Sequence, residues 1–268
     1  MGNRIKGLGR GAVALALALG AAGGARAGLV AEYRFDETGG PLAHASVGAI
    51  DGTLGGAAAF VGGGVRGGAI SLDKATNDYV QMGNNFYFAS AFSVEAWVRM
   101  PAGSADGGPA VSKHQGRVIS GYFLAIGDAG DGCGGSPGSA HFYLAYPCSG
   151  NSTTKVNDGK WHQVVGTYDG FKTSIFVDGV FQSSSPGGNP SLNNDAPFMV
   201  GGFKAPGGAL IGAFTGQVDE VRVYDTALSA GEVGGIYASV IAVPEPETYA
   251  TMLAGLGMLG ALARRRRK

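Results

Sequence analysis

The stretch DGKWHQVVGTYDGFKTSIFVDGV, residues 158–180, decides the fold of this chain. Segments 161–168 and 173–177 within it are rich in Trp, Tyr, Thr, Ile and Val, whose bulk or branching suits a pleated strand. An Asp-Gly pair follows each segment, and Gly accepts a positive φ without a Cβ clash, so both pairs predict tight turns. We therefore expect the central hairpin of an antiparallel β domain here. The core residues expected from it are Trp161, Val165, Ile175 and Val177.

The composition indicates a folded domain with many turns. Of the 268 residues, 50 are Gly and 45% are hydrophobic, so the chain is not of a disordered type. The glycines cluster between short apolar runs without a Gly-X-Y period, which excludes a collagen triple helix. Since all-β domains often exceed about 200 residues, the length allows one sandwich with a single core.

Charge is unevenly distributed, although the formal net charge is zero. Residues 28–242 hold 11 Lys and Arg against 18 Asp and Glu, because many basic residues lie at the two ends. Binding to a phosphate backbone needs positive charge, so this acidic middle argues against nucleic acid as a partner. It is compatible with a bound cation such as calcium.

The first 27 residues have the three parts of a secretory signal peptide in the expected order. Basic residues open the segment, residues 11–22 are apolar, and Ala25-Arg26-Ala27 has the small-x-small cleavage pattern. Cleavage between Ala27 and Gly28 is predicted, and export follows from it. An amphipathic or buried helix is the alternative.

Cys133 and Cys148 are the only two cysteines of the chain. Because export leads to an oxidising compartment, they are predicted to form a disulfide. A loop of this size contributes about 3 kcal/mol to stability in the chain-entropy model. Two unpaired thiols are the alternative, and a metal site is disfavoured because His141 is the only further ligand nearby.

Two long segments alternate as half-buried strands do. In FSVEAWVRM, residues 92–100, one face would carry Phe92, Val94, Ala96 and Val98. In GQVDEVRVY, residues 216–224, one face would carry Val218, Glu220, Arg222 and Tyr224, and the other Gln217, Asp219, Val221 and Val223.

Long helical periodicity is missing from residues 28–227, and one short helix is predicted over 228–237. Ser229 precedes Glu232 by three residues, which is the spacing of a capping box. Many short strands with Gly-rich turns predict an all-β fold, a two-sheet antiparallel jelly-roll sandwich.

The C-terminus changes character after residue 242. Residues 243–247, Val-Pro-Glu-Pro-Glu, form a stiff polar break because Pro fixes φ. The 16-residue apolar run 248–263 is at the short limit for a single transmembrane helix, and the basic end after it would stay in the cytoplasm. This orientation places the acidic middle outside the cytoplasm.

The tail resembles the PEP-CTERM sorting signal of Gram-negative bacteria over residues 242–268. The resemblance rests on Pro244-Glu245-Pro246, the apolar run, and the basic end Arg264, Arg265, Arg266 and Arg267, in that order. It implies processing by an exosortase, and a final place at the cell surface or in the extracellular matrix. An ordinary tail anchor is the alternative.

Residues 28–241 resemble the laminin-G-like, concanavalin A-like jelly roll. The resembling segments, in family order, are 29–37, 92–98, 158–170, 175–179 and 211–228. The resemblance implies a binding or adhesion module, for polysaccharide or protein. A purely structural matrix protein is one alternative.

An atypical glycoside hydrolase is the second alternative, because the same fold houses glycosidases, which need two carboxylates beside the scissile bond. Glycosidases of this fold carry Glu-x-Asp-x-Glu along one strand, and Asp219-Glu220 is the nearest carboxylate pair. Adjacent strand residues point to opposite faces, so this pair is not expected to share a substrate. The four histidines show no ligand spacing: His44, His114, His141 and His162. We expect no enzyme activity.

Calcium is a further expectation that the resemblance implies. Asp36 ends the first strand, Asp219 lies in the last, and Asp51 lies in a loop between, so their oxygens are candidate ligands. The alternative is that all three are solvated or turn-capping carboxylates. Candidate aromatic platforms for a glycan are Tyr122, Tyr143, Tyr146 and Phe171, with buried core residues as the alternative.

Overall fold

The structure is a computed structural model, and it describes residues 28–105, 107–116, 120–127, 133–145, 148–187, 194–205 and 207–242. The predicted signal peptide with Ala27, and the sorting motif with Pro244 to Pro246 and Arg264 to Arg267, lie outside these residues. Within the described ranges, no helix has the length and apolar character needed to cross a membrane.

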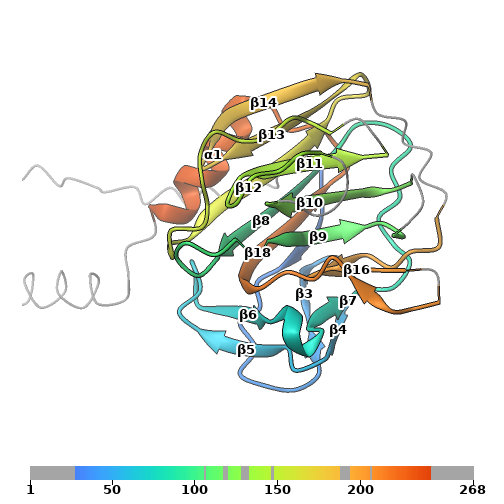
Figure 1. Cartoon of the computed structure of the whole chain (residues 1–268), viewed down its shortest axis with the longest axis vertical. Helices are drawn as coiled ribbons and strands as arrows, with labels where there is room; N and C mark the ends of the chain where they lie inside the picture. Colours follow the sequence, from blue (N-terminus) through green and yellow to red (C-terminus); the bar gives the residue numbers. More distant parts are fainter. Residues whose placement is uncertain are drawn as a thin grey trace, which may run out of the picture.

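Two antiparallel sheets stack on each other, as predicted (Figure 1). Sheet A has the order β14 (Val180–Pro186), β13 (Lys172–Val177), β12 (His162–Tyr168), β8 (Phe92–Arg99), β18 (Gly216–Tyr224), β1 (Leu29–Tyr33) and β3 (Ala45–Val47), with β6 (Gly68–Leu72) on β18 and β5 (Ala59–Gly62) on β6. Sheet B has the order β11 (Ala140–Leu144), β10 (Tyr122–Ile126), β9 (Gly108–Lys113), β15 (Met199–Val200), β7 (Tyr79–Gln81), β4 (Gly52–Gly55) and β2 (Leu42–Ala43). The remaining elements are the pair β16 (Phe203–Lys204) and β17 (Leu210–Ile211), the 3-10 helix η1 (Lys74–Thr76) and α1 (Ala230–Ile241).

The predicted central hairpin is present as β12 and β13, which pair from Val164↔Val177 to Tyr168↔Thr173. The turn into β14 has Asp178 at φ 52° and Gly179 at φ 77°, and two successive positive φ values are what a tight two-residue hairpin turn requires. Ile175 and Val177 enter the main core, as expected.

Trp161 corrects the expectation for this hairpin. It lies just before β12, is only half-buried, and donates its indole N–H to the carbonyl oxygen of Gly63 at 3.1 Å. Because the strand begins one residue later, the pleat does not turn the indole into the sandwich. Trp161 is therefore a surface residue rather than a core residue.

The alternation predicted for residues 92–98 is confirmed. Phe92, Val94, Ala96 and Val98 are all buried in the core between the sheets. The next residues in the pleat, including Glu95 and Trp97, point to the opposite face of sheet A, which we call the outer face.

The alternation predicted for β18 is wrong after Val218. A β-bulge lies between Asp219, which pairs with Trp97, and Arg222, which pairs with Glu95. Glu220 sits inside the bulge at φ 48°. The extra residue shifts the pleat by one position, so Val221 and Val223 enter the core and Arg222 moves to the outer face.

Helix α1 covers part of the outer face of sheet A. Ser229 and Glu232 form the predicted capping box, although the helix starts at Ala230 and extends to Ile241, beyond the expected end at 237. Its buried residues Val233 and Ile236 pack with Val165, Phe176 and Tyr224 of the sheet. The outer face is thus closed to solvent under α1.

Cys133 and Cys148 are joined in a disulfide, with Cα atoms 5.8 Å apart. Both pack against Phe123, Ala125 and Tyr143, a small cluster on the strands β10 and β11. The disulfide therefore holds loop residues against sheet B.

Candidate functional site

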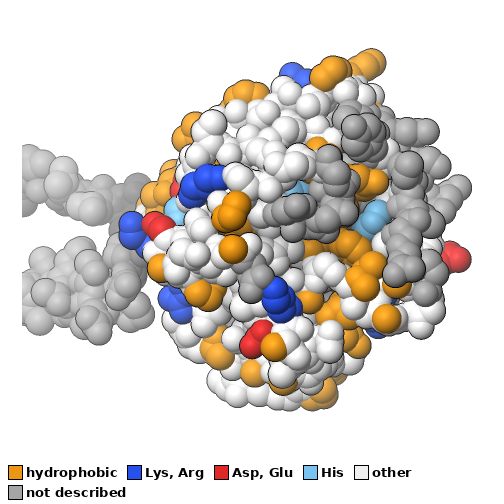
Figure 2. Space-filling model, in the orientation of Figure 1, with side chains coloured by type: hydrophobic (Ala, Val, Ile, Leu, Met, Phe, Trp, Pro, Cys, Tyr) orange, Lys and Arg blue, Asp and Glu red, His pale blue; other side chains and the backbone are white. Residues whose placement is uncertain are grey.

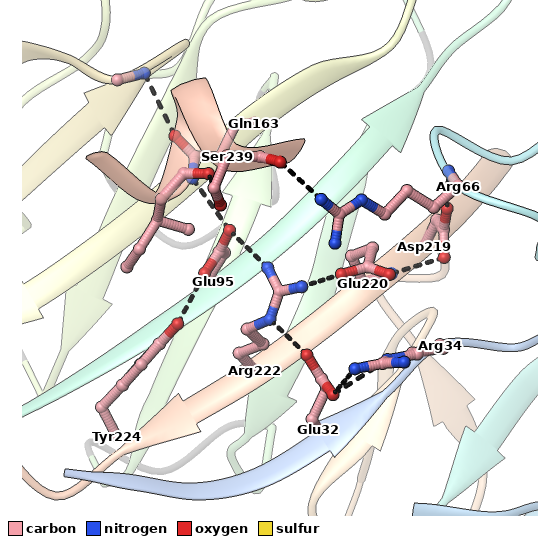
Figure 3. A network of polar contacts seen from close by, with 12 residues as sticks. Glu32, Arg34, Arg66, Glu95, Gln163, Asp219, Glu220, Arg222, Tyr224 and Ser239 are labelled. Atoms are coloured by element: carbon pink, nitrogen blue, oxygen red, sulfur yellow. Dashed lines mark hydrogen bonds and ion pairs between the residues drawn. The ribbon is translucent and has the colours of Figure 1, made fainter. Parts of the chain in front are cut away.

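A group of charged side chains lies buried between sheet A and α1 (Figure 3). Arg222 of β18 is at its centre. Its Nε donates to Glu32 Oε1 at 2.7 Å, its Nη1 to Glu95 Oε1 at 3.1 Å, and its Nη2 pairs with Glu220. Three carboxylates, from β1, β8 and β18, thus surround one guanidinium group.

Two neutral side chains, Tyr224 and Gln163, add hydrogen bonds to this network. The Tyr224 hydroxyl donates to Glu95 Oε2 at 2.9 Å, and Gln163 Nε2 donates to Glu95 Oε1 at 2.8 Å. Gln163 Oε1 in turn accepts from the backbone N–H of Gly179 at 3.1 Å. Both oxygens of Glu95 are therefore occupied, and the network extends to the turn that leads into β14.

Two members of the network, Glu32 and Arg222, are held in their charged forms. Burial opposes ionisation of Glu32, but the hydrogen bond and the positive charge of Arg222, helped by Arg34, lower its pKa overall. Burial also opposes the charge of Arg222, and the surrounding carboxylates, Glu95 first, raise its pKa nonetheless. A buried ion-pair group of this kind fixes side-chain positions and leaves no room for a substrate.

Glu220, the residue on which a glycosidase would depend, belongs to this buried group. It is fully buried and paired with Arg222, and its Oε1 has no hydrogen-bond partner among the described residues. The bulge gives both Asp219 and Glu220 partners on the outer side of the sheet, so the expectation that they point to opposite faces is wrong. Neither carboxylate reaches the surface.

Asp219 has a different electrostatic setting. Burial, aided by the negative charge of Asp36, raises its pKa to about 8. Its Oδ2 accepts from the backbone N–H of Arg66 at 3.1 Å, and Asp36 Oδ1 accepts from the N–H of Gly68 at 2.8 Å. The expected approach of Asp36 and Asp219 is thus present, because both carboxylates hold the loop between β5 and β6.

Asp51 does not join them. Its Oδ1 accepts from the N–H of Ala45 at 3.0 Å, and its Oδ2 lies 2.9 Å from His44 Nδ1. The hydrogen bond from Ala45, helped by the one with His44, lowers the pKa of Asp51. Calcium takes six to eight oxygen ligands, yet the described residues contain no group of three or more acidic, His or Cys side chains that could hold a metal ion. The three expected ligands therefore do not converge on one site, and each of them accepts a hydrogen bond from a backbone N–H group.

An open hollow with a volume of about 370 Å³ lies where β8 ends and β18 begins. It forms where Arg99, the last residue of β8, pairs with Gln217 of β18, which in turn pairs with Ser71 of β6. Thr215 and Gly159 also line it. The sequence places these residues far apart, and the strand register brings them together.

Arg99 organises the hollow. Its Nη2 donates to the side-chain oxygen of Gln217, and its guanidinium carbon lies 5.1 Å from the ring centre of Trp161, which is a cation–π contact. Since the indole N–H of Trp161 is fixed to Gly63, the ring is fixed at its polar edge. Guanidinium, amide and hydroxyl groups beside a half-buried indole are the groups that bind sugar hydroxyls and sugar ring faces.

One carboxylate, Asp73, also lines this hollow. Its Oδ1 accepts from the N–H of Ala75 and caps η1, so it has a local structural role. A second, smaller hollow of about 300 Å³ lies beside Asp36, Glu37 and His44. Glu37 Oε1 accepts from the backbone N–H of His44 at 2.6 Å, and no aromatic platform other than Phe35, which is buried, lines that hollow.

The aromatic residues singled out from the sequence lie elsewhere. Tyr122 is in the core, and Tyr143 is buried and stacks on Phe123 with ring centres 4.5 Å apart. Phe171 is 84% exposed in the turn between β12 and β13, and Tyr146 lies outside the described residues. Sequence reasoning missed Arg99 and Gln217 because each looked like an ordinary outward-facing strand residue.

The histidines have structural partners rather than ligand geometry. His162 Nδ1 lies 2.8 Å from Asp178 Oδ2, and its Nε2 lies 3.0 Å from Asp158 Oδ1. His114 packs edge-on against three aromatic rings, and His141 is buried on β11.

The face shown in Figure 2 has few charged side chains, which are separated by hydrophobic and neutral ones.

Comparison with known families agrees with this architecture. Residues 74–234, more than half of the chain, match the family described as the concanavalin A-like lectin/glucanases superfamily. The chain belongs to this superfamily. Residues 242–268 match the PEP-CTERM protein-sorting motif, so the tail is a sorting signal, as the sequence predicted.

Solved structures of the superfamily's fold resemble the chain at low sequence identity. Domain 4 of AbnA, a GH43 extracellular arabinanase from Geobacillus stearothermophilus in complex with arabinotriose, has 19% identity and a TM-score of 0.60, and the match covers 79% of this chain and 98% of that one. The binding domain of Paraclostridial Mosquitocidal Protein 1 has 16% identity and a TM-score of 0.58, over 79% of this chain and 52% of that one. A Trypanosoma rangeli sialidase has 18% identity and a TM-score of 0.52, over 79% of this chain and 32% of that one. The comparison with curated protein sequences found no match.

Proposed function

We propose that the sandwich of this exported surface protein binds an extracellular polysaccharide and does not cleave it. The hollow beside Arg99 and Trp161 is the proposed binding site. The observation that carries the proposal is the grouping of the Arg99, Gln217, Ser71 and Thr215 side chains around an open volume of about 370 Å³. The half-buried indole of Trp161 lies against the guanidinium group of Arg99, beside this volume.

The chemistry of this hollow suits recognition of sugars. Arg99 offers N–H donors in a planar fork, and the hydroxyl and amide groups both donate and accept, which matches the alternating hydroxyls of a sugar chain. Trp161 adds apolar ring area at small entropic cost. The openness of the site to solvent suits a long polymer rather than an enclosed small molecule.

The carboxylates favour binding over hydrolysis. A glycosidase needs two carboxyl groups about 5–9.5 Å apart on either side of the bond that it cleaves. Here Glu32, Glu95 and Glu220 are buried around Arg222, and Asp73 in the hollow caps η1. Neither group offers an acid and a base to a substrate at the hollow.

The descriptions of the structural neighbours support the proposed binding role. The arabinanase domain is described in complex with arabinotriose, a short sugar chain, and the neighbour from Paraclostridial Mosquitocidal Protein 1 is described as a binding domain. At below 20% identity they support the fold, and the ligand of this chain stays a proposal.

The experiment is a glycan and polysaccharide array probed with residues 28–242, which contain both sheets and α1. We expect retention on at least one bacterial polysaccharide, with no release of reducing ends. Binding to nothing would favour a purely structural matrix protein. Hydrolysis of a polysaccharide by the native domain that is lost in Glu220→Gln would show instead that the domain is a glycosidase.

We further propose that an exosortase processes the tail in a Gram-negative bacterium, after the run 248–263 has anchored the chain with the sandwich outside the cytoplasm. The match of residues 242–268 to the PEP-CTERM motif supports this order of events. Cell fractionation and mass spectrometry of the mature protein test it. A chain changed to Ala at Pro244, Glu245 and Pro246 should stay in the membrane at full mass, whereas the native chain should be found shortened.

A further inference from the structure

Three large apolar side chains lie exposed where α1 meets β14. Val180 and Phe181, the first two residues of β14, are 60% and 50% exposed, and Ile241, the last residue of α1, is 55% exposed. The ring of Phe181 also packs edge-on against Phe176, with centres 5.6 Å apart, so its position is fixed. We call these three residues the apolar edge.

The members of the apolar edge lie on one side of the domain. A Cβ on Gly179 would lie 3.0 Å from Tyr237 Cβ and 3.2 Å from Gly234 Cα, so the turn before Val180 touches this stripe of α1. Helix positions three, four and seven apart share a face. Ile241 therefore extends, by one helical turn, the stripe that contacts the turn leading into β14.

The two elements that carry the apolar edge, β14 and α1, hold few of the charges that normally protect an exposed edge. Outer strands of natural sheets carry charged side chains that keep them in water. The sequence of β14, VFQSSSP, has no charged residue, and α1 has only Glu232, in its first turn. A strand without charged residues, with exposed Val and Phe side chains beside the exposed Ile241, is suited to an apolar partner.

A second copy of the chain is a poor candidate for that partner. Gln182 Nε2 donates to the carbonyl oxygen of Val180 at 3.3 Å, and Gln182 Oε1 accepts from the N–H groups of Thr153 and Thr154. The segment around residue 153 thus already covers part of β14, and Pro186 ends the strand. Strand-to-strand pairing with another copy is hindered at Val180, at Gln182 and at Pro186.

The length of the chain after α1 identifies the partner. Only residues 243–247 separate Ala242 from the apolar run 248–263. A fully extended chain of this length spans about 20 Å. When the apolar run is in a membrane, the C-terminal end of α1 cannot be farther than this from the bilayer surface.

We propose that the apolar edge lies on the lipid bilayer surface while the sorting tail is attached. The inference rests on the proposed anchoring of the chain through residues 248–263. Val180, Phe181 and Ile241 enter the boundary between headgroups and acyl chains, as the apolar side of an interfacial element does. Three side chains without a basic patch bind a membrane weakly by themselves, so removal of the tail releases the domain.

Quenching by brominated lipids tests the contact directly. The chain from residue 28 to 268 is reconstituted into phosphatidylethanolamine–phosphatidylglycerol vesicles, with and without lipids brominated on their acyl chains. Two variants are compared, Phe181→Trp in the apolar edge and Phe171→Trp in the turn at the other end of β13. Trp97 and Trp161 are present in both variants, so the difference reports the introduced indole.

We expect brominated lipid to quench about half of the emission of the indole introduced by Phe181→Trp, since it would lie at the acyl boundary, and to leave that from Phe171→Trp unchanged. Changing Val180 and Ile241 to Ser should then reduce the quenching in Phe181→Trp. Equal emission in the two vesicle types, in chains that float with the vesicles, would overturn docking and leave anchoring intact. Chains that do not float would overturn both. A cross-linked dimer in place of quenching would assign the edge to a second copy.

Discussion

The rings of Trp97 and Tyr237 stack with centroids 5.6 Å apart and planes 6° from parallel. Trp97 is buried on the outer face of β8, and Tyr237 lies in the second half of α1. The stack joins the helix to the middle of sheet A, next to the buried ion pairs of Arg222. It therefore holds α1 over a charged network that must stay out of water.

Tyr237→Ala should lower the free energy of unfolding by about 2–4 kcal/mol, since it removes the stack and much of the contact of α1 with Trp97. Tyr237→Phe is the matched control, because it keeps the ring and should cost less than about 1 kcal/mol. Urea unfolding followed by tryptophan fluorescence measures both. Equal stability of the two variants would show that the stack does not hold the helix.

Arg222→Met should destabilise the fold by about 3–5 kcal/mol, because it leaves Glu32, Glu95 and Glu220 buried without their shared cation. Arg34→Met is the control. Arg34 also pairs with Glu32 at 2.8 Å, but its side chain is 49% exposed, so its loss should cost about 1 kcal/mol or less. Urea unfolding gives both values, and a similar loss in the two variants would contradict the central place of Arg222.

Asp219→Asn should change how stability depends on pH. The pKa of Asp219 is raised from 3.8 to about 8 in the folded chain, so the folded state binds a proton that the unfolded state has released across this window. The free energy of unfolding of the native chain therefore falls as pH rises from about 4 to 8, by up to about 1.4 kcal/mol per pH unit from this group.

The Asn variant has no such proton to lose, so its free energy of unfolding should rise relative to that of the native chain over the same pH range. Thermal melts of both proteins at several pH values test the difference. A stability difference that stays constant with pH would show that Asp219 is ionised in the fold.

His162 should give a pH dependence through its two carboxylates. The hydrogen bond to Asp178 is the main cause of its raised pKa, and Asp158 adds to it, against the effect of burial. Its stabilising effect is therefore complete below the unfolded value of 6.5 and is lost as pH rises through the raised folded value. His162→Phe should cost most at low pH and progressively less above it. An NMR titration of the imidazole in the native chain measures the shift, and a pKa below 6.5 would contradict the geometry.

The hairpin and the main core could be predicted from the sequence because they depend on local signals. The Asp178-Gly179 turn and the alternation in β8 each depend on a few consecutive residues. The β18 bulge could not be predicted, since its register depends on pairing with β8 across more than 100 residues of chain. Glu220 consequently pairs with Arg222, which differs from the placement that a regular pleat predicts.

The candidate site was less accessible to sequence reasoning than the fold. Arg99 and Gln217 become partners only because β8 and β18 are neighbours, and Trp161 lies at the surface because β12 starts one residue after it. Asp51 does not join Asp219 for a similar reason, since the loop folds it onto His44. Residue type identified plausible ligands, and the strand register decided which of them meet.

The most direct test of the central claim is calorimetric titration of the polysaccharide found on the array into the native domain and into Arg99→Ala, with Phe171→Ala as the exposed control. The account predicts that the native domain and Phe171→Ala bind equally, that Arg99→Ala binds about tenfold or more weakly, a loss of about 1.4 kcal/mol, and that the polymer stays uncut. Unchanged affinity in a folded Arg99→Ala variant, or cleavage of the polymer, would contradict it.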